Sequence, residues 1–302
     1  HPRFADLKEP HMTSVAVIAH NGKVLGGGLG RLRDVLTEQG ITDPIWLEVP
    51  KSRKVPARVK EAIKLGADLI FIWGGDGSVQ RCIDAAVGAP VTLAILPAGT
   101  ANLLANNLGI PIDLEEAVDV GLHGNNHTID VGKMNGEHFA VMAGIGFDAL
   151  MIRDTDTAIK DRFGRAAYIW TGARHIHSTP VRTEVRIDGH TWFDDKASCV
   201  LIANVGSIGG GVTAFDHASP DDGKLDVAVM TASGVWQWLR TLTRASVGHA
   251  DKSPLVQMTQ ATKITVETRK RLPYELDGGA RPKTNKLRVH VVAHAVTIRV
   301  PS

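Results

Sequence analysis

The sequence predicts two domains of different class, an α/β domain with a parallel sheet followed by a mostly antiparallel β domain. Its 302 residues suit about two domains. Up to about residue 126, short β-branched runs alternate with helix-period segments, a pattern typical of parallel strands joined by crossover helices. After Gly124, hairpin turns flanked by strand-like runs replace this alternation and favour antiparallel pairing.

Composition and charge exclude several classes of protein. With 43% hydrophobic and 22% charged residues, the chain can bury a core, so disordered and fibrous proteins are excluded. The formal net charge of +2 is too small to indicate nucleic-acid binding, and no nucleic-acid partner is expected. Cys82 and Cys199 lie in apolar stretches and are predicted to be small buried side chains, which suits a reducing cytoplasmic compartment.

No apolar run approaches the roughly 20 residues that cross a bilayer, and the first residues lack the pattern of a signal peptide. We therefore expect a cytoplasmic protein whose membrane contact, if any, is peripheral. Residues 1–11 are polar and unpatterned, and are expected to be disordered or foreign to the fold.

The first half is predicted to contain four buried strands and at least two amphipathic helices. The strand-like runs are Val15–Ala19, Ile45–Val49, Leu69–Trp73 and Val91–Leu96. Apolar residues fall on one helical face in two segments, at Leu29, Leu32, Val35 and Leu36 and again at Val79, Cys82, Ile83 and Ala86.

The second half is predicted to be mostly antiparallel, with hairpin turns at Asn135-Gly136 and Asp188-Gly189. Further strands are expected at His138–Met142, Val181–Ile187, Cys199–Asn204, Leu225–Met230, Ile264–Thr268 and Leu287–Val292. Helices are expected near Lys160–His175 and Val235–Val247. The boundary near residue 130 is a change of pattern, because composition does not change there.

The most informative stretch is a buried strand that ends in Gly74-Gly75-Asp76-Gly77-Ser78 and leads directly into a helix. Glycines let the backbone approach a phosphate, and a helix N-terminus offers N–H groups and a partial positive charge. The Asp76 carboxylate would repel phosphate, so it is expected to bind a hydroxyl, hold a metal ion or organise the loop. The alternative is an ordinary strand-to-helix turn in which Ser78 caps the helix.

A second loop of the same kind, Pro97–Asn102, follows the next strand. Gly99 permits a special backbone conformation, while Thr100 and Asn102 offer polar side chains at the start of a helix. Alone this is a capped helix. Because both loops follow neighbouring parallel strands, they are expected at one sheet edge, where such sheets bind ligands. Asn21 and Lys23, after the first strand, are expected at the same edge and in reach of phosphate.

These loops and several later motifs resemble the diacylglycerol kinase-like lipid kinases, a family that includes sphingosine kinases and shares its nucleotide domain with NAD kinases. The later motifs are Ala143–Ala149, Lys160–Tyr168, Asn204–Gly206, Gly209–Gly211 and Ala218–Asp226. The resemblance implies a Rossmann-like nucleotide-binding domain at 12–130 and 294–302 and an antiparallel β-sandwich at 131–293. A C-terminal strand would return to the first domain.

The resemblance also implies an ATP- and Mg²⁺-dependent enzyme that phosphorylates a lipid alcohol, with diacylglycerol as the first choice. The implied nucleotide contacts are Asn21, Lys23, Gly74, Gly75, Asp76, Gly77, Ser78, Gly99, Thr100 and Asn102. Asp221 and Asp222 would lie near Mg²⁺, with a plain β-turn as the alternative. Lys160 would face phosphate, with a solvated helix charge as the alternative.

The lipid substrate implies peripheral contact with the inner membrane surface. Basic clusters at 51–54, 269–271 and 281–288 can approach anionic headgroups, although each alone is typical of a solvated face. A homodimer is compatible with the sequence.

The sequence departs from the family in three places. Ser78 replaces a threonine and keeps its hydroxyl, and Gln80-Arg81 replaces an Asn-Glu pair. The family's Asp-Gly-Glu appears as Asp277-Gly278-Gly279, so the glutamate expected to accept the alcohol proton is missing.

Asp277 and Glu275 are the candidate replacements for the missing base, since alternate strand residues share a face if the strand continues through the turn. Both are equally compatible with turn or surface roles. Asp76 is the third candidate catalytic residue. A general base typically contributes 10²- to 10⁴-fold, about 3 to 5 kcal/mol, so a slow kinase could survive its loss. The alternatives are a catalytically silent nucleotide- or lipid-binding homologue and a kinase for a soluble acceptor such as NAD.

Overall fold

The computed structural model describes residues 14–146, 180–207, 213–232 and 255–302. The expected segment 1–11, the two expected helices in the second half and Lys160 lie outside these residues. Among the helices that are described, none combines the length and the apolar character needed to span a membrane.

The first half is an α/β domain whose parallel strands have the order β4-β3-β1-β2, so all four predicted strands are confirmed. These strands are β1 (Val15–His20), β2 (Ile45–Val49), β3 (Leu69–Gly74) and β4 (Thr92–Pro97). The helices are α1 (Gly28–Glu38), α2 (Val55–Lys64), α3 (Asp76–Ala86), α4 (Leu103–Asn107) and α5 (Leu114–His123). Two short 3₁₀ turns, η1 (Leu25–Gly27) and η2 (Ser52–Lys54), precede α1 and α2.

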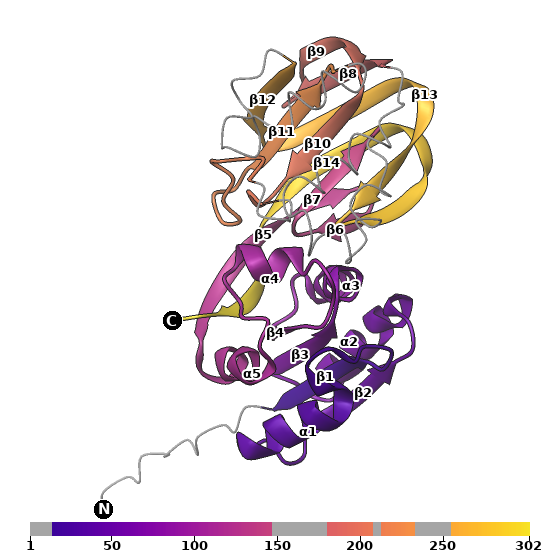
Figure 1. Cartoon of the computed structure of the whole chain (residues 1–302). Helices are drawn as coiled ribbons and strands as arrows, with labels where there is room; N and C mark the ends of the chain where they lie inside the picture. The colour runs from indigo at the N-terminus through magenta and orange to yellow at the C-terminus, as the bar shows by residue number, and fades with distance from the viewer. Residues whose placement is uncertain (1–13, 147–179, 208–212, 233–254) are drawn as a thin grey trace, which may run out of the picture.

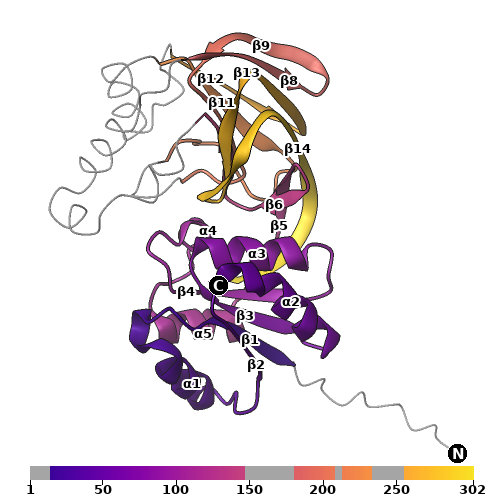
Figure 2. The ribbon, with the colours of Figure 1, turned by 90° about the vertical axis from the view of Figure 1, so that its right-hand side faces the viewer.

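The helices cover both faces of the parallel sheet. One core cluster joins α1 and α5 to one face, and another joins α2, α3 and α4 to the opposite face. Figure 2 shows α2 and α3 across the sheet from α1 and α5. The predicted apolar face of α3 is confirmed, since Val79, Cys82 and Ile83 are all buried. This three-layer arrangement leaves the carboxyl edge of the sheet open to a ligand.

The second half is mostly antiparallel, as predicted. Its strands are β5 (Asn125–Met134), β6 (Glu137–Phe139), β7 (Met142–Ile145), β8 (Val181–Ile187), β9 (His190–Ala197), β10 (Cys199–Ala203), β11 (Leu225–Met230), β12 (Val256–Ala261), β13 (Lys263–Leu276) and β14 (Gly279–Val300). Both predicted hairpin turns are present, with left-handed backbone at Asn135 and Asp188. The inward faces of these strands enclose a hydrophobic core of their own. The two cysteines of the chain, Cys82 in α3 and Cys199 in β10, are free and buried, as predicted.

Two long strands join the halves (Figure 1). β5 pairs antiparallel with the second half of β14, from Val289 to Val300, and the end of β14 pairs parallel with β4. The expected return of the C-terminal strand is therefore present. At the junction, the fully buried Asp130 carboxylate accepts hydrogen bonds from the backbone N–H groups of Gly223 and His294, each 2.7 Å long.

The structure corrects one strand and adds three. The predicted strand His138–Met142 is interrupted at Ala140 and Val141, because their N–H groups donate to the Asp277 carboxylate instead of to a neighbouring strand. The sequence analysis gives no range for β5, β9 or β12. β12 carries polar residues such as Gln257 and Gln260, which mask its strand character.

Candidate active site

The two glycine loops meet at the carboxyl edge of the parallel sheet. A Cβ atom added to Gly99 would lie 2.5 Å from the Gly75 Cα, and one added to Gly75 would lie 3.0 Å from the Gly99 Cα. Real Cβ atoms do not approach backbone as closely as the first of these distances, so position 99 requires glycine, and the second distance leaves little room for a side chain at position 75. The contact brings the loops after β3 and β4 into one continuous surface.

Asp76 organises this surface. Its Oδ1 accepts a hydrogen bond from Leu103 N at 2.5 Å, and its Oδ2 accepts one from Asn102 N at 3.1 Å. These are the first N–H groups of α4, which have no partner within the helix. Of the three roles expected for Asp76, its contacts fit that of loop organiser.

Asn102 supports the second loop from within. Its side chain accepts from Gly99 N and donates to Gly99 O, both at 2.9 Å, and its backbone has a left-handed φ of 47°. The side chain is buried, and Asn102 does not line the cleft described next. The structure therefore places Asn102 behind Gly99.

A cleft of about 380 Å³ lies between these loops and the second half. Its lining residues are His20, Lys23, Ser52, Gly75, Asp76, Gly77, Ser78, Gly99, Thr100, Ala101, Leu103, Asp277, Gly278 and Gly279. Most lie at the carboxyl ends of β1 to β4 or in the loops and helix N-termini that follow these strands. The last three, called the 277–279 turn below, lie where β13 gives way to β14. The cleft therefore brings together eight of the predicted site residues: Lys23, Gly75, Asp76, Gly77, Ser78, Gly99, Thr100 and Asp277.

The N-terminus of α3 lines one side of the cleft, and this side has the features of an anion-binding site. Gly75 is the N-cap residue and no side chain caps the helix, so the alternative interpretation, in which Ser78 caps an ordinary turn, is not confirmed. The Lys23 Nζ lies 3.8 Å from the position that a Cβ on Gly75 would take. A helix N-terminus and an ammonium group together favour an anion.

His20 and Ser52 are cleft residues that the sequence analysis missed. The His20 Nδ1 accepts a hydrogen bond from Gly22 N at 3.2 Å, and burial, followed by the nearby charge of Lys23, lowers the pKa of His20. At neutral pH the ring is therefore neutral and carries its proton on Nε2. The sequence signal that could have identified them is their position, at the end of β1 and shortly after β2, because these strands end at the same sheet edge.

Asp277 faces this edge from the other half. Asp277 and Gly278 form a two-residue turn with φ values of 45° and 75°, so β13 ends at Leu276 and does not continue through the turn. The carboxylate accepts three backbone hydrogen bonds of 2.9 Å, from Ala140, Val141 and Met142. Burial outweighs these bonds and raises the pKa of Asp277 to about 6.

Glu275 is not at the cleft. It is fully buried, and its Oε1 lies 3.7 Å from the position that a Cβ on Gly144 would take. After burial, its charge is the second cause of the raised pKa of Cys199. The parity argument that groups Glu275 with Asp277 does not hold, because β13 ends at Leu276 and Asp277 has a left-handed backbone.

Two other predicted contacts, Gly74 and Asn21, also lie outside the cleft lining. Gly74 packs behind the first loop, where an added Cβ would lie 2.6 Å from the Ser78 Cβ. Asn21 is exposed and donates its backbone N–H to Val49 O at 3.1 Å. Gln80, one of the family departures, donates its side-chain amide to His138 O at 2.6 Å and so joins the two halves.

Asp221 and Asp222 do not line the cleft either. The Asp221 Oδ1 accepts from Ser219 Oγ at 2.6 Å and its Oδ2 lies 3.0 Å from His127 Nε2, contacts that lower the pKa of Asp221. Asp222 accepts from Lys224 N at 2.9 Å. Within the described part of the chain, no three His, Cys, Asp or Glu side chains are grouped to hold a metal ion. This turn therefore offers no ready magnesium cage, and its metal role stays a prediction.

Comparison with known proteins supports both halves. Residues 25–134 match the diacylglycerol kinase catalytic domain, and residues 141–300 match the YegS C-terminal NAD kinase beta sandwich-like domain. The chain is 29% identical to the diacylglycerol kinase of Bacillus subtilis over 72% of this chain and 73% of that protein. It is 26% identical to a protein of Shewanella frigidimarina named "Probable lipid kinase YegS-like", over 96% of this chain and 94% of that protein.

Solved structures agree on the fold. A diacylglycerol kinase from Bacillus anthracis superposes with a TM-score of 0.75 at 20% identity, covering 97% of this chain and 98% of that chain. An NAD kinase from Archaeoglobus fulgidus in complex with ATP gives a TM-score of 0.51 at 11% identity, covering 95% and 93%. The second family domain spans more than half of this chain, and these two relatives are named diacylglycerol kinase and probable lipid kinase YegS-like. The chain therefore belongs to the diacylglycerol kinase and YegS family of lipid kinases.

Proposed function

We propose that this kinase-type phosphotransferase moves the γ-phosphate of ATP to the hydroxyl of a lipid, with diacylglycerol as the acceptor and phosphatidic acid as the product. The observation that carries the proposal is the meeting of the two glycine loops opposite the 277–279 turn. In this proposal the glycine loops form the side of the cleft that binds the phosphates, called the phosphate side, and the 277–279 turn forms the side that binds the lipid hydroxyl, called the acceptor side.

The phosphate side consists of the α3 N-terminus and Lys23. ATP would bind as its magnesium complex, since Mg²⁺ in kinases is usually held by substrate phosphates together with one or two carboxylates, and the ion would supply neutralisation of phosphate charge. Little covalent chemistry is required of the protein in phosphoryl transfer, because positioning and charge stabilisation supply most of the catalysis. The loop contacts of Asp76 serve that positioning.

The acceptor side consists of the 277–279 turn. Asp277 is the proton acceptor that we favour, because it lines the cleft whereas Glu275 does not. A carboxylate can accept about four hydrogen bonds. Backbone N–H groups supply three of those that Asp277 accepts, which leaves about one for a substrate hydroxyl. A pKa of about 6 keeps the group ionised at neutral pH and basic enough to accept a proton.

The test is transfer of labelled phosphate from ATP to diacylglycerol, ceramide, a sphingoid base, undecaprenol and NAD, each with Mg²⁺ and with the lipids in mixed micelles. We expect transfer to diacylglycerol and none to NAD. Transfer to NAD alone would support the soluble-acceptor alternative. ATP binding by calorimetry without transfer to any acceptor would support a silent homologue, as the missing carboxylate at Gly279 suggests.

Membrane contact is part of the same proposal. A lipid acceptor requires the cleft to reach the bilayer, and the basic clusters support a peripheral approach to anionic headgroups. Co-sedimentation with vesicles of phosphatidylglycerol and phosphatidylcholine should increase with the anionic fraction and decrease with salt. Vesicle binding that changes neither with the anionic fraction nor with the salt concentration would contradict this part of the proposal.

A further inference from the structure

The place of the missing side chain at position 279 is filled by another residue. A Cβ atom on Gly279 would lie 2.8 Å from the Arg281 Nη1 and 3.2 Å from Leu276 O. The first contact is closer than real Cβ atoms allow, so a side chain at 279 and the present position of the Arg281 guanidinium exclude each other. The arginine can therefore take this position only because position 279 lacks a side chain.

A carboxylate on strand β6 fixes the Arg281 side chain. The Arg281 Nε lies 2.9 and 3.0 Å from the two Glu137 carboxylate oxygens, and Nη2 lies 2.7 Å from Oε2. The Arg281 side chain is only 11% exposed. The hydrogen bonds to Glu137 are the main cause of the raised pKa of Arg281. A forked, half-shielded pair of this kind has a defined geometry, unlike most surface ion pairs.

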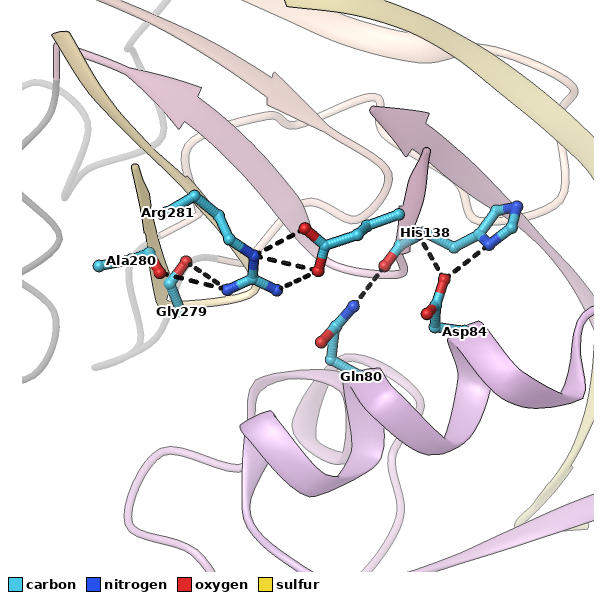
Figure 3. Close-up of polar contacts among 7 residues, drawn as sticks. Gln80, Asp84, His138, Gly279, Ala280 and Arg281 are labelled. Atoms are coloured by element: carbon cyan, nitrogen blue, oxygen red, sulfur yellow. Dashed lines mark hydrogen bonds and ion pairs between the residues drawn. The ribbon is translucent and has the colours of Figure 1, made fainter. Parts of the chain in front are cut away.

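The other end of the guanidinium contacts the turn itself. Nη1 donates to Gly279 O at 3.1 Å, with a longer contact of 3.4 Å to Ala280 O. Figure 3 shows the Arg281 guanidinium directed toward the carbonyl groups of Gly279 and Ala280. Arg281 therefore ties the residue that follows the Asp277-Gly278 turn to strand β6.

Strand β6 is in turn attached to the helix that begins at the phosphate side of the cleft. Asp84 Oδ1 accepts from His138 N at 2.9 Å and lies 2.8 Å from His138 Nδ1, while Gln80 donates to His138 O. Figure 3 shows Gln80 and Asp84 rising from α3 toward β6. A continuous set of polar contacts thus runs from α3 through β6 to the acceptor-side turn.

We propose that Arg281, anchored by Glu137, is a positioning residue that holds the 277–279 turn and its Asp277 carboxylate against the cleft, in the space where a side chain at position 279 would lie. The proposal rests on the proposed function, because it assigns Arg281 a part in the same transfer. The Asp277 charge is the smallest of the causes that raise the pKa of Arg281, and the same attraction acts in return to favour the ionised carboxylate.

The test compares Arg281→Met, Arg281→Lys, Glu137→Gln and the exchange Glu137→Arg/Arg281→Glu. Arg182→Met and Asp194→Asn are matched controls, since Arg182 pairs with Asp194 at 2.8 Å on the β8–β9 hairpin, away from the cleft. Arg281→Met and Glu137→Gln should lower kcat by about 10- to 100-fold, as a misplacement near 1 Å does. The KM and Kd for ATP should stay within about twofold of the parent values.

Two results separate positioning from a merely structural role. The acid limb of the pH–kcat profile should move to higher pH in Arg281→Met, because loss of the cation raises the pKa of Asp277, and should stay in place in Arg281→Lys. The exchanged pair should recover part of the kcat lost by either single variant. An unchanged kcat and acid limb in Arg281→Met, or a parallel change in ATP affinity, would overturn the proposal.

A readout without catalysis keeps this proposal separate from the kinase assignment. The Ala140, Val141 and Met142 amides donate to Asp277, so amide exchange there should accelerate in Arg281→Met and Glu137→Gln but not in the controls. If the parent protein transfers phosphate to no acceptor, the proposed function fails while accelerated exchange still supports the positioning contact. Unchanged exchange overturns the positioning contact whatever the activity.

Discussion

Replacement of Asp277 by asparagine is the substitution that most directly examines the acceptor side of the cleft. The amide has nearly the same shape, but it cannot accept a proton from the lipid hydroxyl. Because general-base assistance typically contributes 10²- to 10⁴-fold, kcat should fall by a factor in that range. With a pKa of about 6, the parent enzyme should lose activity as pH falls below 6, by about tenfold for each further pH unit.

The sign of this pH effect follows from the carboxylate chemistry. Asp277 acts in its ionised form, so protonation at low pH removes activity and deprotonation at high pH does not. Asp277→Asn should therefore show both a low kcat and no acid limb near pH 6. The amide nitrogen would also face one of the backbone N–H groups, which should cost about 1–3 kcal/mol of unfolding free energy.

The assay is labelled phosphate transfer to diacylglycerol between pH 5 and 8, with unfolding in urea measured in parallel. Asp188→Asn is the matched control, because Asp188 also begins a two-residue Asp-Gly turn, with a φ of 48°, and accepts from Lys263 N at 2.8 Å away from the cleft. A kcat of Asp277→Asn within threefold of the parent, or an acid limb that persists in it, would refute the role of Asp277 as base.

Three further predictions concern the nucleotide loops and the junction between the halves. Gly99→Ala should abolish ATP binding in calorimetry, because its Cβ would collide with Gly75. Gly30→Ala is the control and should bind ATP normally, because position 30 has open space around it. Equal ATP affinity of both variants would contradict the loop geometry. Lys23→Met should raise the KM for ATP about tenfold, and an unchanged KM would remove Lys23 from the phosphate side. Asp130→Ala should lower the unfolding free energy in urea by about 2–6 kcal/mol, since two backbone N–H groups lose their acceptor, and a loss below 1 kcal/mol would contradict the junction described.

The sequence predicts well whatever depends on neighbouring residues. The four parallel strands, the apolar face of α3 and the hairpin turn at Asp188 follow from periodicity and from turn chemistry, which are local. The meeting of Gly75 and Gly99 follows from one additional rule, that parallel strands end at a common edge. For these features the structure adds distances and exact boundaries to what the sequence predicts.

Features set by contacts between distant residues could not be predicted in this way. The break between β6 and β7 depends on a carboxylate more than 130 residues later in the chain, as the separation of Ala140 and Asp277 shows. The different positions of Glu275 and Asp277 depend on where β13 ends. The Arg281 guanidinium beside Gly279 depends on Glu137, a partner that no spacing in the sequence indicates.

A crystal structure with a non-hydrolysable ATP analogue and Mg²⁺ tests the account most directly. It should show the terminal phosphates within hydrogen-bonding distance of the first N–H groups of α3 and of the Lys23 Nζ, with the γ-phosphate facing Asp277. A nucleotide bound elsewhere, or one whose γ-phosphate points away from the 277–279 turn, would contradict it.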